Sequence, residues 1–417
     1  MRESRYLEHK EDISNSFLKT VSAFANYQGG TIKFGIRDNG EVVGIHNPTQ
    51  ACLVIENKIN DSLNPKVDFQ LQVTEDTNVI ILTVKEGLDK PYFYKSKAYK
   101  RNDSSTVEVE SYELRRLILE GQNKTYESLP AEKQDITFHY LERSLMTQMS
   151  IKSLTDDILV TLGLYKKDEG FNRAAELLSD ENTLFGIDVV RFGESINIIL
   201  DRETYAGISI LEQYERAMTM YRRYYQYEEI RGALREKVQK IPEEAYREAI
   251  ANAIVHRAWD INAHIRVALY DERIEILSPG GLPDGMTKQE YLEGQISILR
   301  NPIIGNVFFR LHHIERFGTG VKRINSAYFE SKVKPIFEVF ENSIKVVLPV
   351  MQKELPVSDD EKLVYDSLVR NRKLSSSDVA KHTGFGKTKV IKLLKSMMDQ
   401  GYIRIEGEGR GTKYTTT

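Results

Sequence analysis

Basic residues gather on one side of an expected helix near the C-terminus, where they could contact the phosphates of a nucleic acid. Apolar residues recur at helical spacing between positions 387 and 400, at Val390, Leu393, Leu394 and Met397. If this stripe packs inward, the outer face carries Lys387, Thr388, Lys389, Lys392 and Lys395. Lysines near a helix N-terminus suit phosphate contacts, because the first backbone N–H groups also face anions. Such contacts give salt-dependent affinity but little sequence readout.

The elements around this helix are expected to form a winged helix-turn-helix over residues 358–417. A helix at about 360–370 is followed by a Ser-capped short helix through His382, the turn Gly384-Phe385-Gly386, and two strands at 402–405 and 412–414. This order is typical of a winged helix. Arg404, Arg410 and Lys413 would lie on its wing. The alternative is a solvated lysine face on a small protein–protein module.

A second constellation lies on one expected helix in the middle of the chain. Glu248, Asn252 and His256 follow one another at intervals of four residues, which drift by only about 40° per step around a helix. Pro242 would open this helix, and strands at 265–270 and 274–277 follow it. The alternative is that Asn252 and His256 only make hydrogen bonds from the helix to a neighbouring loop.

Three blocks separated by polar segments are expected to position these residues. The first, residues 1–121, shows a helix at 17–25, strands at 32–36, 67–73 and 79–84, and a closing helix at 111–120. Asn39-Gly40 is a type I′ turn signal, so Val42-Val43 should begin a return strand. The second, residues 135–350, shows helices at 153–164, 172–178 and 210–227 and hairpin strands at 187–190 and 196–200. Segments 122–132 and 353–360 are expected to be linkers. The fold class is α+β multidomain.

Composition limits the classes of protein that remain. The chain has 417 residues and a net charge of −3, but residues 359–417 hold twelve Lys and Arg against eight Asp and Glu, which leaves +4 there. The positive excess is therefore local. Cys52 is the only cysteine, which excludes an intrachain disulfide and thiolate-rich zinc sites. No apolar run is long enough to span a membrane, and the charged start Met1 to Arg5 does not resemble a signal peptide. We expect a cytoplasmic protein.

Short motifs follow one another through the first block: Leu7-Glu8-His9-Lys10, Val21-Ser22-Ala23-Phe24-Ala25-Asn26, Gly29-Gly30, Ile32-Lys33-Phe34-Gly35-Ile36, Asp38, Val43-Gly44-Ile45 and Tyr99-Lys100-Arg101-Asn102-Asp103-Ser104-Ser105-Thr106. Over about residues 1–120 they resemble the Schlafen AlbA_2 domain. The resemblance implies nucleic-acid binding, here through Lys33, Lys100 and Arg101, with exposed strand-edge charge as the alternative. In some members it implies cleavage of transfer RNA.

The metal site of those members matches Glu3, Glu8 and Asp38 in this sequence. Carboxylates are suitable ligands for Mg²⁺ or Mn²⁺, and such a metal can polarise a phosphate and activate water. Five-residue spacing, however, places Glu3 and Glu8 on opposite faces of a strand. Glu8 could instead simply pair with Lys10.

The middle block resembles the GHKL ATPases in the divergent form of the RecG-like C-terminal domain. The resemblance rests on the run Arg247 to Arg257, Ser278-Pro279-Gly280-Gly281-Leu282-Pro283, Arg300-Asn301-Pro302 and Glu315-Arg316-Phe317-Gly318-Thr319-Gly320. It implies an α/β sandwich that binds ATP, with Asn252 holding Mg²⁺, Glu248 orienting water, and Gly280, Gly281, Gly318 and Gly320 approaching phosphate. Ser278 stands near the place of the adenine-reading aspartate, which is a departure from the family.

The blocks together predict a DNA-binding transcriptional regulator that acts as a homodimer, since paired half-sites raise affinity and specificity. RNA is a second possible partner. One alternative is an enzyme, a Schlafen-like metal-dependent endoribonuclease acting on transfer RNA. The other is an ATP-binding regulatory or interaction scaffold, with little expectation of ATP hydrolysis. The sequence leaves open whether the protein is an enzyme.

Overall fold

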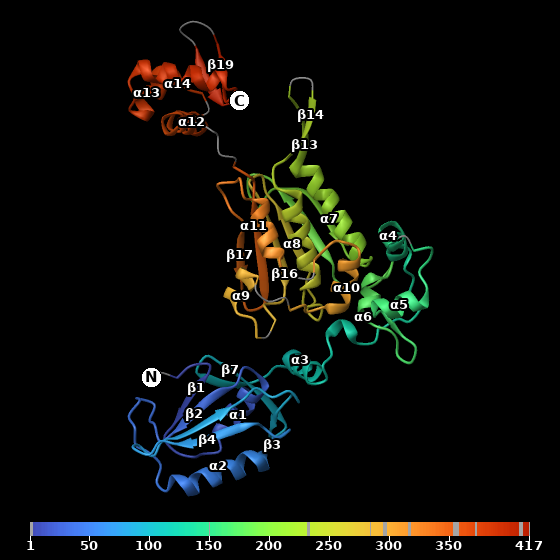
Figure 1. Cartoon of the computed structure of the whole chain (residues 1–417), viewed down its shortest axis with the longest axis vertical. Coiled ribbons are helices and arrows are strands. Elements are labelled where there is room, and N and C mark those ends of the chain that lie inside the picture. Colours follow the sequence, from blue (N-terminus) through green and yellow to red (C-terminus); the bar gives the residue numbers. More distant parts are fainter. Residues whose placement is uncertain are drawn as a thin grey trace. The chain divides into compact units, whose positions relative to one another are not determined.

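The computed structural model describes residues 3–149, 151–231, 234–283, 285–294, 298–315, 318–352, 358–371, 373–407 and 412–416. The chain forms two compact units (Figure 1). The first consists of Met1–Ala327 and Pro335–Val350, and the second of Tyr328–Lys334 and Met351–Thr417. The first unit contains both the N-terminal block and the middle block, and the second contains the C-terminal block.

The N-terminal block has two small sheets around the buried helix α1 (Phe17–Asn26). The first sheet has the order β1-β2-β5-β4, formed by β1 (Leu7–Lys10), β2 (Gly30–Phe34), β5 (Ile80–Val84) and β4 (Phe69–Val73). The second has the order β3-β6-β7-β8, formed by β3 (Leu63–Asn64), β6 (Phe93–Tyr94), β7 (Lys97–Asn102) and β8 (Ser105–Glu108). Phe17, Val21 and Phe24 of α1 are buried in the core of this block. Helices α2 (Pro48–Ser62) and α3 (Ser111–Gly121) complete it.

The prediction of a return strand at Val42-Val43 is wrong. The turn itself forms, with Gly40 at φ +89° and its N–H donating to the Arg37 carbonyl. Only one isolated bridge, between Ile36 and Val42, follows it. Strand β2 pairs in parallel with β1 and antiparallel with β5, so both of its edges are occupied. Beyond this bridge, the N–H groups of Val43 and Gly44 both donate to the Gly35 carbonyl, so no regular ladder develops.

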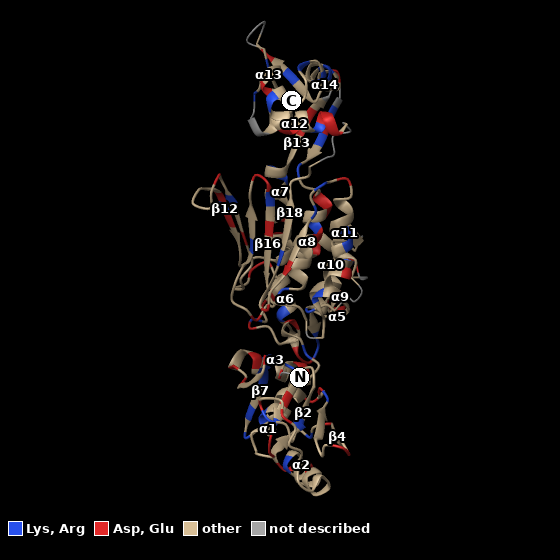
Figure 2. Ribbon diagram, turned by 90° about the vertical axis from the view of Figure 1, so that its left-hand side faces the viewer, with Lys and Arg blue, Asp and Glu red and all other residues tan. Residues whose placement is uncertain are grey.

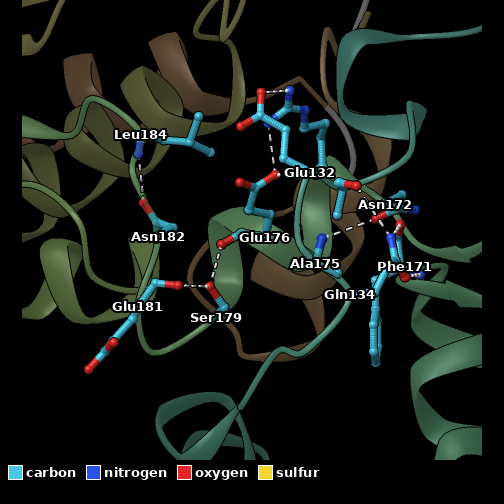
Figure 3. A network of polar contacts seen from close by, with 12 residues as sticks. Glu132, Gln134, Phe171, Asn172, Ala175, Glu176, Ser179, Glu181, Asn182 and Leu184 are labelled. Carbon is cyan, nitrogen blue, oxygen red and sulfur yellow. Dashed lines mark hydrogen bonds and ion pairs between the residues drawn. The ribbon is translucent and has the colours of Figure 1, made fainter.

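The segment between the first two blocks is not a free linker. Residues 125–134, which we call the strap, dock on helix α6 (Arg173–Leu178) and on strand β10 (Gly170–Phe171), which pairs with β9 (Tyr165–Lys166) (Figure 3). The Leu129 carbonyl accepts from Arg173 N–H, and Gln134 exchanges hydrogen bonds with Phe171. Arg173 also pairs with Glu132 at 2.6 Å. The strap thus belongs structurally to the middle block.

The middle block is a sheet of six strands in the order β12-β11-β15-β16-β18-β17. The strands are β11 (Ile187–Phe192), β12 (Ile199–Tyr205), β15 (Ile265–Leu269), β16 (Arg273–Pro279), β17 (Ile336–Val339) and β18 (Ser343–Pro349). Only β11 and β15 pair in parallel; the other neighbours are antiparallel. Helices α8, α10 and α11 lie on one side of this sheet in the edge-on view (Figure 2). This two-layer arrangement agrees with the expected α/β sandwich.

Helices of the middle block confirm most expected positions. They are α4 (His139–Met149), α5 (Asp156–Leu162), α6, α7 (Ile210–Tyr225), α8 (Glu243–Val255), α9 (Lys288–Glu293), α10 (Pro302–Arg310) and α11 (Gly320–Ala327). The expected helix at 210–227 stops at Tyr225, because the chain turns directly into the hairpin β13 (Gln226–Arg231) and β14 (Leu234–Gln239). That hairpin and the strands β17 and β18 carry no periodic signal strong enough to predict.

The C-terminal block has the expected winged-helix order. It consists of α12 (Asp359–Asn371), α13 (Ser376–Thr383), α14 (Lys387–Asp399), β19 (Ile403–Glu406) and β20 (Lys413–Thr416). Ser375 caps α13 by accepting from Asp378 N–H, and Gly384 ends that helix at φ +72°. Val390, Leu394 and Met397 are buried with Val364, Leu368 and Val379, so the predicted stripe of α14 does face the core. The expected linker at 353–360 lies mostly outside the described residues.

Candidate functional site

Helix α8 presents the first group of candidate residues. Pro242 precedes it, and Glu243 and Glu244 lie in its first turn. The positive end of the helix dipole stabilises carboxylates at that position. Asn252 Nδ2 donates to Glu248 Oε1 at 3.1 Å. Glu248 is 4% exposed, and burial raises the pKa of its carboxyl above the ordinary value. The predicted spacing therefore does bring Glu248 and Asn252 together.

Helix α11 begins directly against this pair. A Cβ placed on Gly320 would lie 2.5 Å from Asn252 Nδ2 and 2.8 Å from Glu248 Oε1. Both atoms are side-chain ends, so a side chain at position 320 would have to displace the Asn252–Glu248 pair. Glycine lets the start of α11 approach α8 without disturbing that pair.

Two further polar side chains lie at the end of α8 and on β16, and a glycine follows that strand. Burial, together with the nearby Arg300 charge, lowers the pKa of His256 to about 4, so this imidazole is neutral at physiological pH. Ser278 Oγ donates to the Ala253 carbonyl at 2.8 Å. Gly280 follows Ser278 at φ +106°, a conformation that favours glycine, and its N–H donates to the Asn342 carbonyl.

Arg300 and Asn301 bind the end of α8, and Arg300 also contacts the loop after β16 that contains Gly280 and Gly281. Arg300 donates to the carbonyls of His256 and Gly281 at 3.1 and 2.7 Å. Asn301, which is 1% exposed, donates to the carbonyls of Val255 and Arg257, both at 2.8 Å. These hydrogen bonds satisfy buried carbonyls at the helix end, which has no intrahelical donors left for them. Arg300 and Asn301 are thus the frame of the site rather than its lining.

Sequence reasoning missed Glu127, a strap residue that supports this frame. Its carboxylate is fully buried and accepts from the N–H groups of Ile303 and Ile304 at 2.6 and 2.9 Å, at the start of α10. Pro302 begins α10 directly after the frame residue Asn301. Burial raises the pKa of Glu127 to about 7, although the two backbone donors act in the opposite direction. A glutamate in a polar segment gives no sequence signal for such a role.

A pocket forms where these elements meet. Asn252, Gly280, Gly281, Gly318 and Gly320, all predicted to bind nucleotide, line it. Glu248 lies behind Asn252. About 100 Å³ of the pocket is open to the centre of a water molecule. Its remaining described lining is mostly apolar, from β16, α9, α11, β17 and β18.

These residues fit only part of an ATP molecule. The apolar lining and the glycines suit a flat ring. Among the described lining residues, however, no Lys or Arg side chain is available to a triphosphate, and Ser278 uses its hydroxyl hydrogen on Ala253. Residues 295–297, 316 and 317 lie outside the described part of the chain. The described lining therefore leaves Asn252 and the backbone of its glycines as the groups that a phosphate could meet.

The three carboxylates expected to hold a metal are not gathered into a cluster. Glu8 is 6% exposed and pairs with Lys10 and Arg101, each at 2.6 Å. Glu3 Oε1 accepts from the His9 N–H at 2.9 Å, and Asp38 is exposed beyond β2. Within the described residues no group of three His, Cys, Asp or Glu side chains is placed to hold a metal ion. Cations already neutralise Glu8, so this carboxylate set does not fit Mg²⁺ or Mn²⁺ as it stands.

The basic residues predicted to bind nucleic acid in the N-terminal block differ in their surroundings. Arg101 is 7% exposed and donates to Thr106 and to the Ser4 carbonyl besides pairing with Glu8. Lys100 pairs with Glu113 at 2.6 Å. Lys33 is half-buried on β2. Arg101 and Lys100 are therefore engaged inside the block.

The basic residues of α14 are differently placed. Lys387, Thr388, Lys389, Lys392 and Lys395 are all exposed, opposite the buried stripe. Lys389 pairs with Asp360 at 2.7 Å and lies over the Phe385 ring. In the described part of the block, Lys387, Lys392 and Lys395 have no carboxylate partner. Figure 2 marks the basic positions of α13 and α14 in blue.

The wing contributes fewer free charges. Arg404 is exposed and contacts Glu406 at 3.3 Å. Lys413 is exposed at the start of β20. Arg410 lies outside the described residues. The basic face of the C-terminal block therefore rests mainly on α14.

Comparison with known families gives three matches along the chain. Residues 3–110 match the family described as Schlafen, AlbA_2. Residues 262–348 match the family described as Putative ATP-dependent DNA helicase recG C-terminal, and residues 351–417 match the family described as Sugar-specific transcriptional regulator TrmB. The second match begins after α8, so Glu248 and Asn252 lie outside it.

Solved structures include a protein of similar overall architecture. The DIP2311 protein from Corynebacterium diphtheriae is 18% identical, with a TM-score of 0.50, and the match covers 99% of this chain and 92% of that one. At this identity the likeness shows the fold alone. The N-terminal domain of a RecG-related protein from Nitrosomonas europaea is 28% identical over 25% of this chain and 83% of its own, with a TM-score of 0.21. No curated protein matches the chain.

The fold and the three matches define the class of protein. It is a multidomain α+β protein with segments similar to the Schlafen AlbA_2 family, to the RecG C-terminal family and to the TrmB family of transcriptional regulators. The first and last of these segments support a nucleic-acid-binding protein. No helix among the described residues is long and apolar enough to cross a membrane.

Proposed function

We propose that this protein is a DNA-binding transcriptional regulator whose C-terminal winged helix contacts DNA through α14. The observation that carries the proposal is the exposed face of Lys387, Lys392 and Lys395, which have no carboxylate partner in the described part of the chain. Unpaired lysines on the third helix of a winged helix meet phosphates when that helix enters the major groove. The match of this block to a family of transcriptional regulators supports the same function.

The charge distribution favours the C-terminal block over the N-terminal block as the main DNA contact. Arg101 and Lys100 form ion pairs within their own block, whereas only Lys389 among the α14 lysines has such a pair. A phosphate must compete with Glu8 or Glu113 at the first two positions but not at Lys392 or Lys395. We propose that the AlbA_2 domain binds nucleic acid more weakly, through other groups such as Lys33.

A salt titration tests the proposed function. Fluorescence anisotropy of the full chain with a labelled mixed-sequence DNA duplex should show binding that weakens steeply with added salt. Three lysine–phosphate contacts alone give a slope of log K against log salt of about −2.7. Absence of salt-sensitive binding to DNA at low ionic strength would contradict the proposal and leave a protein-interaction scaffold.

The homodimer follows from the same proposal, because two half-sites on DNA favour paired winged helices. Light scattering of the purified chain should give twice the monomer mass. The endoribonuclease stays an untested prediction, and the ion pairs of Glu8 give it no support.

A further inference from the structure

The exposed face of α14 carries one large apolar side chain among its lysines. Ile391 is 48% exposed and is not among the side chains that pack in the core of the described C-terminal block. It lies one helical turn after Lys387 and one turn before Lys395, so these three side chains share one face of the helix. Thr388, three residues before Ile391, places a second methyl group next to it. An apolar surface thus lies between the charges that we propose contact phosphates.

The composition of α14 limits how this helix can read bases. In the major groove, Asn and Gln recognise adenine, Arg recognises guanine, and Asp or Glu accepts from cytosine. Lys387–Asp399, all of which the structure describes, contains no Arg, Asn, Gln or Glu, and its one Asp stands at the last position. The lysines, which can also donate to guanine, are assigned to phosphates by the proposed function. The side chains left for reading bases are therefore apolar or hydroxylic.

The position of Ile391 suits a contact with base edges. It is the fifth residue of α14, and the N-terminal residues of such a helix are the ones that reach the bases in the major groove. The C5 methyl group of thymine is the apolar group on those edges, and aliphatic side chains contact it. An apolar protein surface fits this face less well, because it would remove water from the neighbouring ammonium groups without supplying an anion.

We infer that Ile391, with Thr388 beside it, reads thymine, by contact with the C5 methyl group while Lys387 and Lys395 contact the flanking phosphates. The lysines then supply affinity, and Ile391 supplies discrimination between bases. This inference rests on the proposed function and adds to it the class of DNA that the protein prefers, which is DNA rich in A·T pairs.

Two duplexes that differ only in the C5 methyl group test this inference. One alternates adenine and thymine, and the other carries deoxyuridine in place of every thymidine, so that phosphates and base pairing are the same. In fluorescence anisotropy, the full chain should bind the thymine duplex about fourfold tighter, which corresponds to about 0.8 kcal/mol for one buried methyl group. The two salt slopes should be equal, because the number of phosphate contacts does not change.

The outcomes separate this inference from the proposed function. Equal affinity for the two duplexes, or tighter binding of the deoxyuridine duplex, would overturn the inference and leave DNA binding by α14 in place. Absence of salt-sensitive binding to either duplex would contradict the proposed function, and the inference with it.

Variants of two exposed aliphatic residues locate the preference. Ile391→Ser should bring the ratio of the two affinities to about one, whereas Ile391→Val, which keeps an aliphatic side chain, should retain a preference for thymine. Val369→Ser is the matched control, because Val369 lies on α12 and is 53% exposed, and it should keep the wild-type ratio. A wild-type ratio in Ile391→Ser would place the thymine contact elsewhere and overturn the inference. The comparison of the two duplexes with the wild type does not depend on the folding of any variant.

Discussion

Arg101 on β7 lies against Glu8 on β1, with 2.6 Å between Arg101 Nη1 and Glu8 Oε2. Both side chains are buried, at 7% and 6% exposure. Lys10 contacts the other carboxylate oxygen, so two cations neutralise one anion. The residue that the family resemblance assigns to a metal and the residue assigned to nucleic acid are thus each other's partners.

Removal of the Glu8 carboxylate should destabilise the N-terminal block. Glu8→Ala leaves the Arg101 charge buried without its carboxylate, a change that typically costs about 3–5 kcal/mol. Urea unfolding followed by circular dichroism measures the effect. Glu11→Ala is the matched control, because Glu11 and its partner Arg37 are both exposed, and it should cost about 1 kcal/mol or less.

Comparison of the wild type with Glu8→Ala also distinguishes an ion-pair partner from a metal ligand. If Glu8 acts as an ion-pair partner, Mn²⁺ leaves the unfolding midpoint of the wild type and of Glu8→Ala unshifted. A midpoint of the wild type that rises with Mn²⁺, together with metal-dependent cutting of labelled transfer RNA that Glu8→Ala abolishes, would make the protein a nuclease.

Glu127 should make the stability of the middle block depend on pH. The folded protein holds its proton up to about pH 7, whereas an unfolded chain releases it near 4.5. The folded state therefore binds more protons between these values, and this contribution to stability is present at low pH and lost as pH rises from 4.5 to 7. The loss is about 3 kcal/mol.

The Glu127→Gln variant tests that dependence, because its amide does not titrate. Thermal midpoints measured from pH 4.5 to 7.5 should fall for the wild type relative to Glu127→Gln. Glu132→Gln, which changes an exposed glutamate on the same strap, should follow the wild type. Wild-type and Glu127→Gln curves that run parallel across this range would show that burial does not perturb Glu127.

Gly320→Ala should disturb the pocket by packing alone. The added methyl group would meet Asn252 and Glu248 at less than 3 Å, and overpacking of this kind costs about 1–3 kcal/mol. Gly305→Ala in α10 is the control, since its nearest neighbour is the flexible end of Leu299. The control should be neutral or slightly stabilising, because alanine favours a helix. Similar thermal midpoints for both variants would contradict the close approach of α11 to α8.

The sequence predicts best the elements whose signals are local. The Ser375 cap, the Gly384 turn and the apolar stripe of α14 each depend on a few neighbouring residues, and all three appear as expected. The pair Glu248 and Asn252 is similar, because one turn of helix brings them together. The structure places the four glycines that the family resemblance indicates in the lining of one pocket, and what they bind stays a prediction.

The features that sequence reasoning missed depend on distant partners. Val42-Val43 makes only one bridge, and soon after it the Ile45 N–H donates to the carbonyl of Asn78, a residue far along the chain. Arg101 and Glu8 were assigned to different functions because nothing local shows that β7 and β1 place them side by side. Glu127 could not be found because its partners are the backbone N–H groups of Ile303 and Ile304.

The central claim, that α14 contacts DNA through its free lysines, is tested most directly by removing them. The triple variant Lys387→Ala, Lys392→Ala, Lys395→Ala should bind a labelled DNA duplex weakly and lose about 0.9 from the salt slope for each phosphate contact removed. Lys166→Ala, in the middle block and paired with Glu169, should behave as the wild type. A triple variant that keeps both the affinity and the salt slope of the wild type would contradict the account.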